Sequence, residues 1–199
     1  MNSKEKMLSG ELYDPTENEL MSEQQKWNEL LYAFNQTRPS ESAKRESLLK
    51  KLLAECGDDC YVEPPLRANW GSNTHFGNGV YANFNLTLVD DAPVYVGNDV
   101  MFGPNVTIAT AGHPIDPDLR KMKMQFNLAV TIKDNVWIGA NSVVLPGITI
   151  GENSVIGAGS VVTKDIPANV VAVGNPCKVL REIGERDKVY YHKDRKINK

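Results

Sequence analysis

The most restrictive feature of this 199-residue chain is a six-residue pattern that repeats without interruption from residue 132 to residue 167. All six copies open with Ile or Val, and Gly stands second in three of them. A period of six matches neither the 3.6-residue period of a helix nor the alternation of a half-buried strand. It is typical of a parallel β-helix, in which each repeat contributes one short strand and one turn. We therefore predict stacked coils whose β-branched residues point inward.

The same frame recurs upstream and slips once by two residues, with copies that begin at Phe76, Ala82, Leu88, Val96, Phe102 and Ile108. Residues 109–131 then break the repeat, and the frame resumes 24 residues after Ile108. Because 24 is a multiple of six, an internal loop can leave the coil and rejoin it in register. Loops of this length in compact domains are usually functional, although a tolerated surface insertion would leave the same pattern.

The first 60 residues have a different composition and predict two helices. Apolar residues from Leu20 to Phe34 show helical spacing, with a possible capping box at Ser22–Gln25, and a second set runs from Leu48 to Leu53. Helices here would cover one end of the stack, which otherwise exposes open strand edges. We expect a helical cap at 1–60, a β-helix at 61–176 with its loop at 109–131, and a C-terminal extension at 177–199 with a short helix and tail.

Composition argues against several classes of partner. The chain has 22 Lys and Arg against 25 Asp and Glu, a formal net charge of −3, and no basic cluster, so we expect no nucleic-acid partner. It has no signal peptide and no apolar run of membrane-spanning length, so we expect no membrane partner. Three cysteines are an odd count that fits a reduced cytoplasm better than a disulfide framework. We therefore expect the protein to be cytoplasmic.

The histidines are the first candidates for chemistry, because a smooth β-helix needs a loop, a cap or a neighbouring chain to form a cleft. The chain has three: His75, which we place at a coil corner with a structural role, His192 in the charged tail, and His113. His113 lies at the base of the internal loop, before Pro114. Position alone leaves two roles open: a loop histidine bonded to backbone, or a general base, since imidazole titrates at about 6.5.

Several motifs together resemble the galactoside and maltose O-acetyltransferases, most closely the galactoside branch. They are the hexapeptide array, Glu46-Ser-Leu-Leu49, Val62-Glu-Pro-Pro65, Tyr81-Ala-Asn-Phe-Asn-Leu-Thr87, Val89-Asp-Asp91, Gly112-His-Pro-Ile115, Val136-Trp-Ile-Gly139 and the segment 157–166. The resemblance covers nearly the whole chain. It implies a left-handed parallel β-helix, an exception to the usual right-handed crossover. It also implies a homotrimer with an active site in each groove between neighbouring chains, a heterologous contact that closes into a ring.

By this resemblance, acetyl-coenzyme A donates its acetyl group to a sugar hydroxyl, and no metal is required. His113 would remove the hydroxyl proton so that the sugar oxygen attacks the thioester directly. The family position for the oxyanion donor falls on Ala140, whose backbone N–H can serve. Asn83 matches an asparagine that contacts the acceptor and supports the transition state, and Asp91 matches a carboxylate that binds sugar hydroxyls. From the residues alone, Asn83 and Asp91 are also ordinary coil-corner residues.

The acceptor side departs from the family pattern at three places. Asn69 stands where the family often has Ser or Asp, which predicts a different sugar preference. Pro15 stands where the family has a carboxylate, and Asp14 is the neighbouring candidate to replace it. Residues 122–125 of the loop also differ from the family, and we expect them to line the acceptor entrance.

The donor side follows the family more closely. The resemblance implies that Trp137 packs along the pantetheine arm and that Lys178 and Arg181 reach the phosphates, where fixed positive charge is useful. The other implied coenzyme contacts are Ala140, Ala158, Thr163 and Lys164. From the residues alone, the two basic side chains form an ordinary solvated face, and Trp137 could equally meet a partner chain.

Three alternatives remain at this point. The same scaffold serves acetyltransferases for non-sugar acceptors, such as xenobiotics or serine. A zinc carbonic anhydrase of the left-handed β-helix class would need three converging histidines, for which His113 and His75 are the only candidates within the coils. A non-catalytic hexapeptide-repeat assembly protein would need no histidine at the base of the loop.

Overall fold

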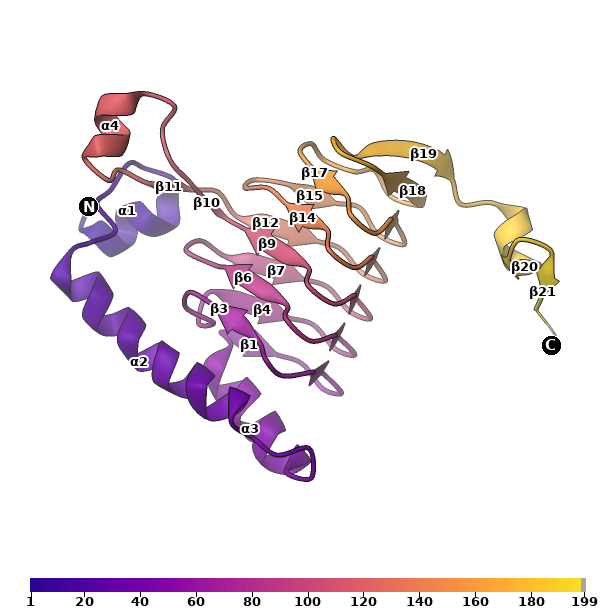
Figure 1. The fold of residues 1–199 in the computed structure, drawn as a ribbon, viewed down its shortest axis with the longest axis horizontal. Helices are drawn as coiled ribbons and strands as arrows, with labels where there is room; N and C mark the ends of the chain where they lie inside the picture. The colour runs from indigo at the N-terminus through magenta and orange to yellow at the C-terminus, as the bar shows by residue number, and fades with distance from the viewer. Residues whose placement is uncertain (198–199) are drawn as a thin grey trace.

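The structure is a computed structural model that describes residues 1–197 (Figure 1). Its main body is a parallel β-solenoid that forms a three-faced prism, confirming the predicted β-helix. The first face contains β1 (Glu55–Cys56), β4 (Thr74–Phe76), β7 (Val94–Val96), β12 (Val130–Ile132) and β15 (Thr149–Ile150). The second contains β2 (Tyr61–Val62), β5 (Tyr81–Ala82), β8 (Met101–Phe102), β13 (Trp137–Ile138), β16 (Val155–Ile156) and β18 (Val170–Val173). The third contains β3 (Arg67–Ala68), β6 (Thr87–Val89), β9 (Thr107–Ala109), β14 (Val143–Val144) and β17 (Val161–Val162).

The core of the prism is a set of columns in which equivalent residues of successive coils lie one above another. Ile138 pairs with Phe102 on one side and Ile156 on the other, and all three are at most 1% exposed. Their outward neighbours alternate with them, as period-two strands require. The Ile and Val residues that open the repeats therefore point inward as predicted.

The corners of the coils are held by asparagines in the left-handed backbone region. Asn85, Asn105 and Asn141 have φ values of 60°, 59° and 59°. Their side-chain amides form a ladder in which Asn85 donates to Asn105 and Asn105 to Asn141, each at 3.1 Å. Asn suits these corners because its short polar side chain tolerates positive φ and bonds locally.

The edge between the third and first faces, here called the third–first edge, changes length along the stack. Eight residues separate Thr87 on the third face from the equivalent Tyr95 on the first, whereas six separate Val143 from Thr149. The early coils therefore carry two additional residues at this edge. They are the structural origin of the frame slip in the repeat.

The N-terminal helices cover the start of the stack, as predicted. They are α1 (Ser3–Ser9), α2 (Asn18–Asn35) and α3 (Ser42–Leu52). The predicted capping box at Ser22 is wrong: α2 begins at Asn18, and the Ser22 hydroxyl donates back to the Asn18 carbonyl at 2.7 Å. The real capping box belongs to α1, where Asn2 and Glu5 bond each other's backbone N–H.

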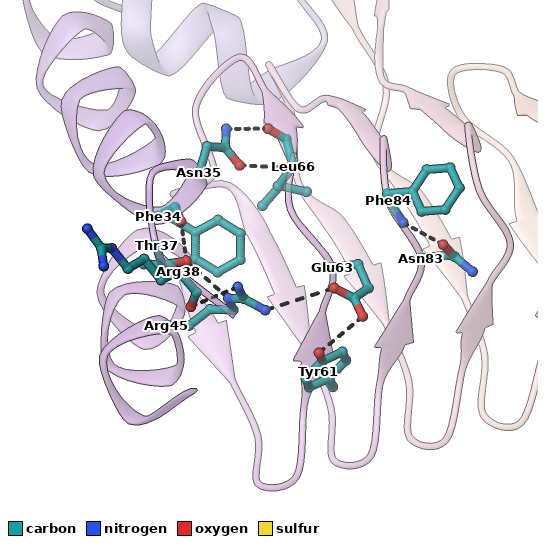
Figure 2. A network of polar contacts seen from close by, with 10 residues as sticks. All are labelled: Phe34, Asn35, Thr37, Arg38, Arg45, Tyr61, Glu63, Leu66, Asn83 and Phe84. Atoms are coloured by element: carbon teal, nitrogen blue, oxygen red, sulfur yellow. Dashed lines mark hydrogen bonds and ion pairs between the residues drawn. The ribbon is translucent and has the colours of Figure 1, made fainter. Parts of the chain in front are cut away.

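The cap is joined to the first coil by apolar packing and by paired polar contacts. Phe34, Leu49 and Leu52 belong to the same buried cluster as the coils. The Asn35 amide binds both backbone groups of Leu66, each at 2.8 Å (Figure 2). The buried Arg45 donates to the Thr37 hydroxyl at 3.0 Å, and its guanidinium lies 3.9 Å from the Glu63 carboxylate.

The internal loop forms an arm, defined as residues 110–129, that leaves the third–first edge (Figure 1). Its base is an antiparallel ribbon of β10 (Ala111–Gly112) and β11 (Phe126–Asn127), and its tip carries α4 (Pro117–Lys121). Tyr13 pairs with Gln125 in an isolated β-bridge, so the N-terminal segment lies along the arm.

The C-terminal extension adds strands that the sequence did not predict. β19 (Lys178–Glu182) pairs antiparallel with β18, and a 3-10 turn (Glu185–Lys188) takes the place of the expected short helix. A hairpin of β20 (Tyr190–His192) and β21 (Arg195–Lys196) follows. Among the described residues, no helix has the length and apolar character to cross a lipid bilayer. All three cysteines are free thiols.

Candidate active site

The residues predicted from the sequence divide between two edges of the prism. Asn69 follows β3, Asp91 follows β6, and the arm with His113 follows β9, so all three lie at the third–first edge. Thr163 and Lys164 follow β17 at the same edge, further along the stack. Asn83 follows β5, Ala140 follows β13 and Ala158 follows β16, which places this second group at the second–third edge. Asn83 and Asp91 thus stand at opposite ends of β6, and one chain does not bring them together.

His113 is held by its backbone partner in a defined tautomer. Its Nδ1 lies 2.8 Å from the carbonyl oxygen of Met124. A carbonyl can only accept, so Nδ1 carries the hydrogen and Nε2 keeps its lone pair. The ring is exposed in the single chain. The arrangement leaves a fixed imidazole whose other nitrogen makes no hydrogen bond within residues 1–197.

The arm ribbon requires a glycine directly before this histidine. Gly112 lies opposite Phe126, and a Cβ at position 112 would come within 2.9 Å of the Phe126 ring. Continued by one residue beyond the paired strands, this register sets His113 across from Gln125. Residues directly opposed in an antiparallel pair have their side chains on one face of the ribbon.

Asp91 and Asn69 form a polar pair at the third–first edge. The Asn69 amide donates to Oδ2 of Asp91 at 2.7 Å, and the Trp70 indole N–H donates to Oδ1 at 3.3 Å. Asp91 is 6% exposed. Each carboxylate oxygen keeps a further lone pair, so the pair can still accept from sugar hydroxyls.

Asp90 lies beneath this pair and is fully buried. Its carboxylate accepts from the Trp70 backbone N–H at 2.9 Å and from the Thr74 hydroxyl at 3.0 Å. Burial, together with a smaller contribution from the charge on Asp91, raises the pKa of Asp90 to about 7 despite these two bonds. Asp90 therefore fixes the corner from which Asn69 and Asp91 project.

Sequence reasoning missed a buried polar network that joins the N-terminal segment to the arm. Gln125 Nε2 donates to the Tyr13 hydroxyl at 2.7 Å and to Asn127 Oδ1 at 2.9 Å. Asn127 Nδ2 donates to the Met7 carbonyl and to the Tyr13 hydroxyl, both at 2.9 Å. Burial raises the pKa of Tyr13 to about 12. Three of these four bonds join residues more than 100 positions apart, so no local sequence pattern could have predicted them.

Asp14 is occupied with its own turn rather than with the arm. Its Oδ1 accepts from the backbone N–H of Thr16 at 2.8 Å and from the Thr16 hydroxyl at 2.7 Å. The Thr16 side-chain bond lowers the pKa of Asp14. It is the neighbouring Tyr13, and not Asp14, that bonds to the arm.

The second–third edge presents hydrogen-bond donors. Oδ1 of Asn83 accepts from the Phe84 backbone N–H at 2.8 Å, which turns the NH2 group of Asn83 outward (Figure 2). Within residues 1–197, the backbone N–H of Ala140 donates no hydrogen bond, whereas its carbonyl accepts from Gly159 at 2.8 Å. Each group is therefore a candidate N–H donor for an oxyanion, and β8 lies between β5 and β13, which sets the two donors two coils apart.

Some of the residues predicted to bind the coenzyme lie on the adjoining second face. Trp137 is half exposed there and lies in register with Val155, Val171 and Arg181 in one outward column. Arg181 makes a two-pronged bond to Asp187 at 2.7 and 2.8 Å, and this bond lowers the pKa of Asp187 to about 2. Lys178 lies opposite Val173 on β19. By contrast, Thr163 and Lys164 lie at the third–first edge, away from this column.

The other histidines lie apart from this arrangement. His75 is in strand β4 and not at a corner, contrary to our expectation; its Nδ1 lies 3.5 Å from the Glu55 carboxylate. His192 is exposed on β20. Among residues 1–197, no three His, Cys, Asp or Glu side chains are grouped to hold a metal ion.

Comparisons with known proteins cover the cap and the coils. Residues 6–57 match the maltose acetyltransferase hexapeptide capping motif, and residues 129–164 match the six-repeat bacterial transferase hexapeptide. The chain is 54% identical over 199 residues to galactoside O-acetyltransferase of Lactococcus lactis subsp. lactis, covering 100% of this chain and 96% of that protein. A solved galactoside acetyltransferase in complex with coenzyme A aligns with a TM-score of 0.96 and 48% identity over 100% of both chains. A maltose O-acetyltransferase structure from Clostridium difficile 630 aligns with a TM-score of 0.91 and 46% identity, over 93% of this chain and 99% of that one.

Proposed function

Because this chain belongs to the galactoside and maltose O-acetyltransferase family, we propose that it moves the acetyl group of acetyl-coenzyme A to a hydroxyl group of a galactoside, maltose or a related sugar. The observation that carries the proposal is similarity over the full length, through cap, coils and arm, to a galactoside O-acetyltransferase. A structural relative that holds coenzyme A supports the donor. Membership makes the chain an acyltransferase, which sets aside a non-catalytic assembly protein and a carbonic anhydrase.

We infer that His113 is the general base. Its Nδ1 hydrogen is committed to the Met124 carbonyl, so Nε2 is the nitrogen that takes the proton of the sugar hydroxyl. The sugar oxygen then bonds to the thioester carbonyl carbon, and the C–S bond breaks in the second step. The departing thiolate takes the proton from Nε2, so the neutral imidazole of His113 is regenerated and the donor leaves as free coenzyme A.

The tetrahedral intermediate needs donors where its negative oxygen develops. The outward NH2 of Asn83 and the free backbone N–H of Ala140 are the candidates. Their orientation is fixed before substrate arrives, by the Phe84 N–H in one case and by the coil corner in the other. Such preorganised donors are each worth roughly 10²–10³ in rate.

The division of these groups between two edges supports a site shared by neighbouring chains. The third–first edge of one chain, with His113, Asn69 and Asp91, would face the second–third edge of the next chain. That edge carries Asn83 and Ala140, and Trp137 lies on the adjoining second face. Three copies closing into a ring would give three equivalent grooves. Thr163 and Lys164 would then contact the coenzyme from the side opposite Trp137. Arg181 would need to exchange its bond to Asp187 for a phosphate.

Subunit complementation tests the shared groove. Two variants, His113→Ala and Asn83→Ala, would each be inactive alone. If the site lies between chains, co-refolding them in equal amounts regains about a quarter of wild-type activity, because one groove in four then receives both intact residues. If each chain holds a whole site, mixing regains nothing.

The acceptor class is tested by thiol release from acetyl-coenzyme A over a panel of an aryl galactoside, an aryl glucoside, maltose, glucose, serine and chloramphenicol. Turnover confined to sugars supports the proposal. Turnover confined to serine or chloramphenicol would move the chain to the non-sugar acetyltransferases of the same scaffold.

A further inference from the structure

The amide of Gln125 is fixed by a chain of hydrogen bonds whose direction can be read from one end. The Met7 carbonyl can only accept, so the group of Asn127 that faces it at 2.9 Å must be the amide nitrogen. Asn127 Oδ1 is then the acceptor that faces Gln125 at 2.9 Å, so Gln125 presents its own nitrogen there. Both hydrogens of Gln125 Nε2 are used, one by Asn127 Oδ1 and one by the Tyr13 hydroxyl.

This orientation leaves the carbonyl oxygen of Gln125 as the open end of the side chain. In the described part of the chain, Oε1 of Gln125 makes no hydrogen bond, and no side-chain polar atom is both buried and without a partner. Because the residue is only 7% exposed, Oε1 must be part of the little that solvent can reach. Polar atoms at nearly buried positions are normally hydrogen-bonded. The accessible Oε1 of Gln125 is therefore an acceptor that a bound ligand with a hydrogen-bond donor could satisfy.

The residues next to Gln125 contact both the proposed base and the residue that carries the proposed sugar-binding carboxylate. The carbonyl of the preceding residue, Met124, holds the His113 ring at 2.8 Å. The register of β10 and β11, continued by one residue beyond the paired strands, sets Gln125 across from His113. Asn127, which accepts a hydrogen bond from Gln125, has its Nδ2 3.4 Å from the Asp91 backbone carbonyl. Residues at opposed positions have Cβ atoms about 4.5–5.5 Å apart, so their side chains are near enough to contact one small ligand.

We propose that Gln125 determines acceptor specificity by accepting a hydrogen bond from the sugar hydroxyl next to the one that is acetylated, and that Tyr13 positions it. The inference rests on the proposed function and assigns a substrate contact within it. A polar site of this kind selects against an acceptor that lacks the hydroxyl, because the buried oxygen is then left without its donor. The N-terminal segment thereby acts on specificity through Tyr13, without touching the reacting atoms.

The experiment pairs a side-chain change with an acceptor change. Wild type, Gln125→Met and Gln125→Glu are assayed with the best aryl glycoside of the panel and with each of its monodeoxy analogues. Met keeps the length of Gln without its acceptor, and Glu keeps an acceptor oxygen. Gln25→Met on the exposed face of α2 is the matched control. Acceptor kcat/KM, the KM for acetyl-coenzyme A and thermal midpoints are recorded.

We expect wild type to lose about tenfold in kcat/KM on one monodeoxy analogue. Gln125→Met should lose about the same on the parent glycoside and nothing further on that analogue. Gln125→Glu keeps an acceptor oxygen for the sugar but sets a carboxylate oxygen against Asn127 Oδ1, so it should retain the discrimination while its thermal midpoint falls. The KM for acetyl-coenzyme A should stay unchanged. Tyr13→Phe should weaken discrimination at the same sugar position by a smaller factor, and unchanged discrimination would remove Tyr13 from the proposal.

Two results would overturn the inference and are distinguishable. If sugars are turned over but Gln125→Met lowers kcat/KM equally for the parent and every analogue, or not at all, Gln125 makes no specific contact while the proposed function stands. If wild type turns over no sugar, the proposed function and this inference fail together. Should Gln125→Met fail to fold, Gln125→Glu and Tyr13→Phe give the same comparison.

Discussion

In the coils a residue stacks on counterparts 16 to 20 positions away, or 36 positions away across the arm, whereas in the arm the decisive contacts join residues more than 100 positions apart. Trp137 pairs with Val155 and Tyr61 with Tyr81, but Gln125 bonds Tyr13 and Asn127 bonds Met7. Each coil buries its apolar side chains in the same way and packs against the coil before it and the coil after it. The arm is instead held by one network of hydrogen bonds that does not repeat. This contrast predicts that stability resides in the coils and that chemistry resides where the repeat is broken.

The sharpest test of that division is His113→Ala. The ring is exposed and its one bond is to a backbone carbonyl, so the unfolding midpoint should stay unchanged. Loss of a general base should lower kcat by about 10²–10⁴. A His75→Ala control should keep its activity, because that ring lies on the first face beside Glu55. Activity that survives in His113→Ala would remove the base from the arm.

The opposite result is expected for Ile138→Ala. This side chain is fully buried between Phe102 and Ile156, so a cavity should cost about 3 kcal/mol in the free energy of unfolding. Its matched control is Leu119→Ala in α4, a helix without buried residues, where we expect less than about 1 kcal/mol. Denaturant titration measures both. Equal losses would mean that the arm is as tightly built as the coils.

A third test uses pH at the edge where coil and site meet. The Asp90 pKa is about 7 in the folded chain against 3.8 for the free side chain. Between these values the folded state keeps a proton that the unfolded state has released, so the Asp90 contribution to stability falls as pH rises from about 4 to 7. Asp90→Asn cannot titrate. Its free energy of unfolding relative to wild type should therefore rise by about 2 kcal/mol between pH 4 and pH 6. A difference that does not change with pH would contradict the raised pKa of Asp90.

The smallest effect is expected at a corner. Asn141→Ala removes one rung of the amide ladder and strains a backbone with φ of 59°, which should cost about 1 kcal/mol. Asn141→Gly also loses the side-chain hydrogen bond, but glycine adopts positive φ without strain, so it should destabilise the fold less than Asn141→Ala. Thermal melts compare the two variants. An equal cost for both would assign the stabilisation to the ladder alone.

The sequence anticipated the coils because their constraint is local and repeated. It also marked the third–first edge, since the two-residue slip of the frame coincides with the longer corners that carry Asp90 and Asp91. The motif resemblance brought out Asn69 and His113 beside them.

What could not be predicted is held by contacts distant in sequence. Nothing near Tyr13 or Gln125 indicates that they meet, because the bond depends on how the arm and the N-terminal segment return to one place. β19 was missed for a related reason: it has no repeat of its own and forms by pairing with the exposed edge of β18. The Ser22 capping box failed because the same letters also fit a helix interior, where Ser bonds the carbonyl four residues back.

The two ends of the stack are closed very differently. Phe34, Leu49 and Leu52 of the cap are buried against the first coils, whereas every residue of β19 over the last coil is exposed. A column of coils behaves as a one-dimensional cooperative chain that frays from its weaker end. Opening should therefore begin at β18 and β17 and travel toward the arm. The proposed coenzyme-binding residues Ala158, Thr163 and Lys164 would lose their order first, so donor affinity should be lost on heating before the acceptor corner opens.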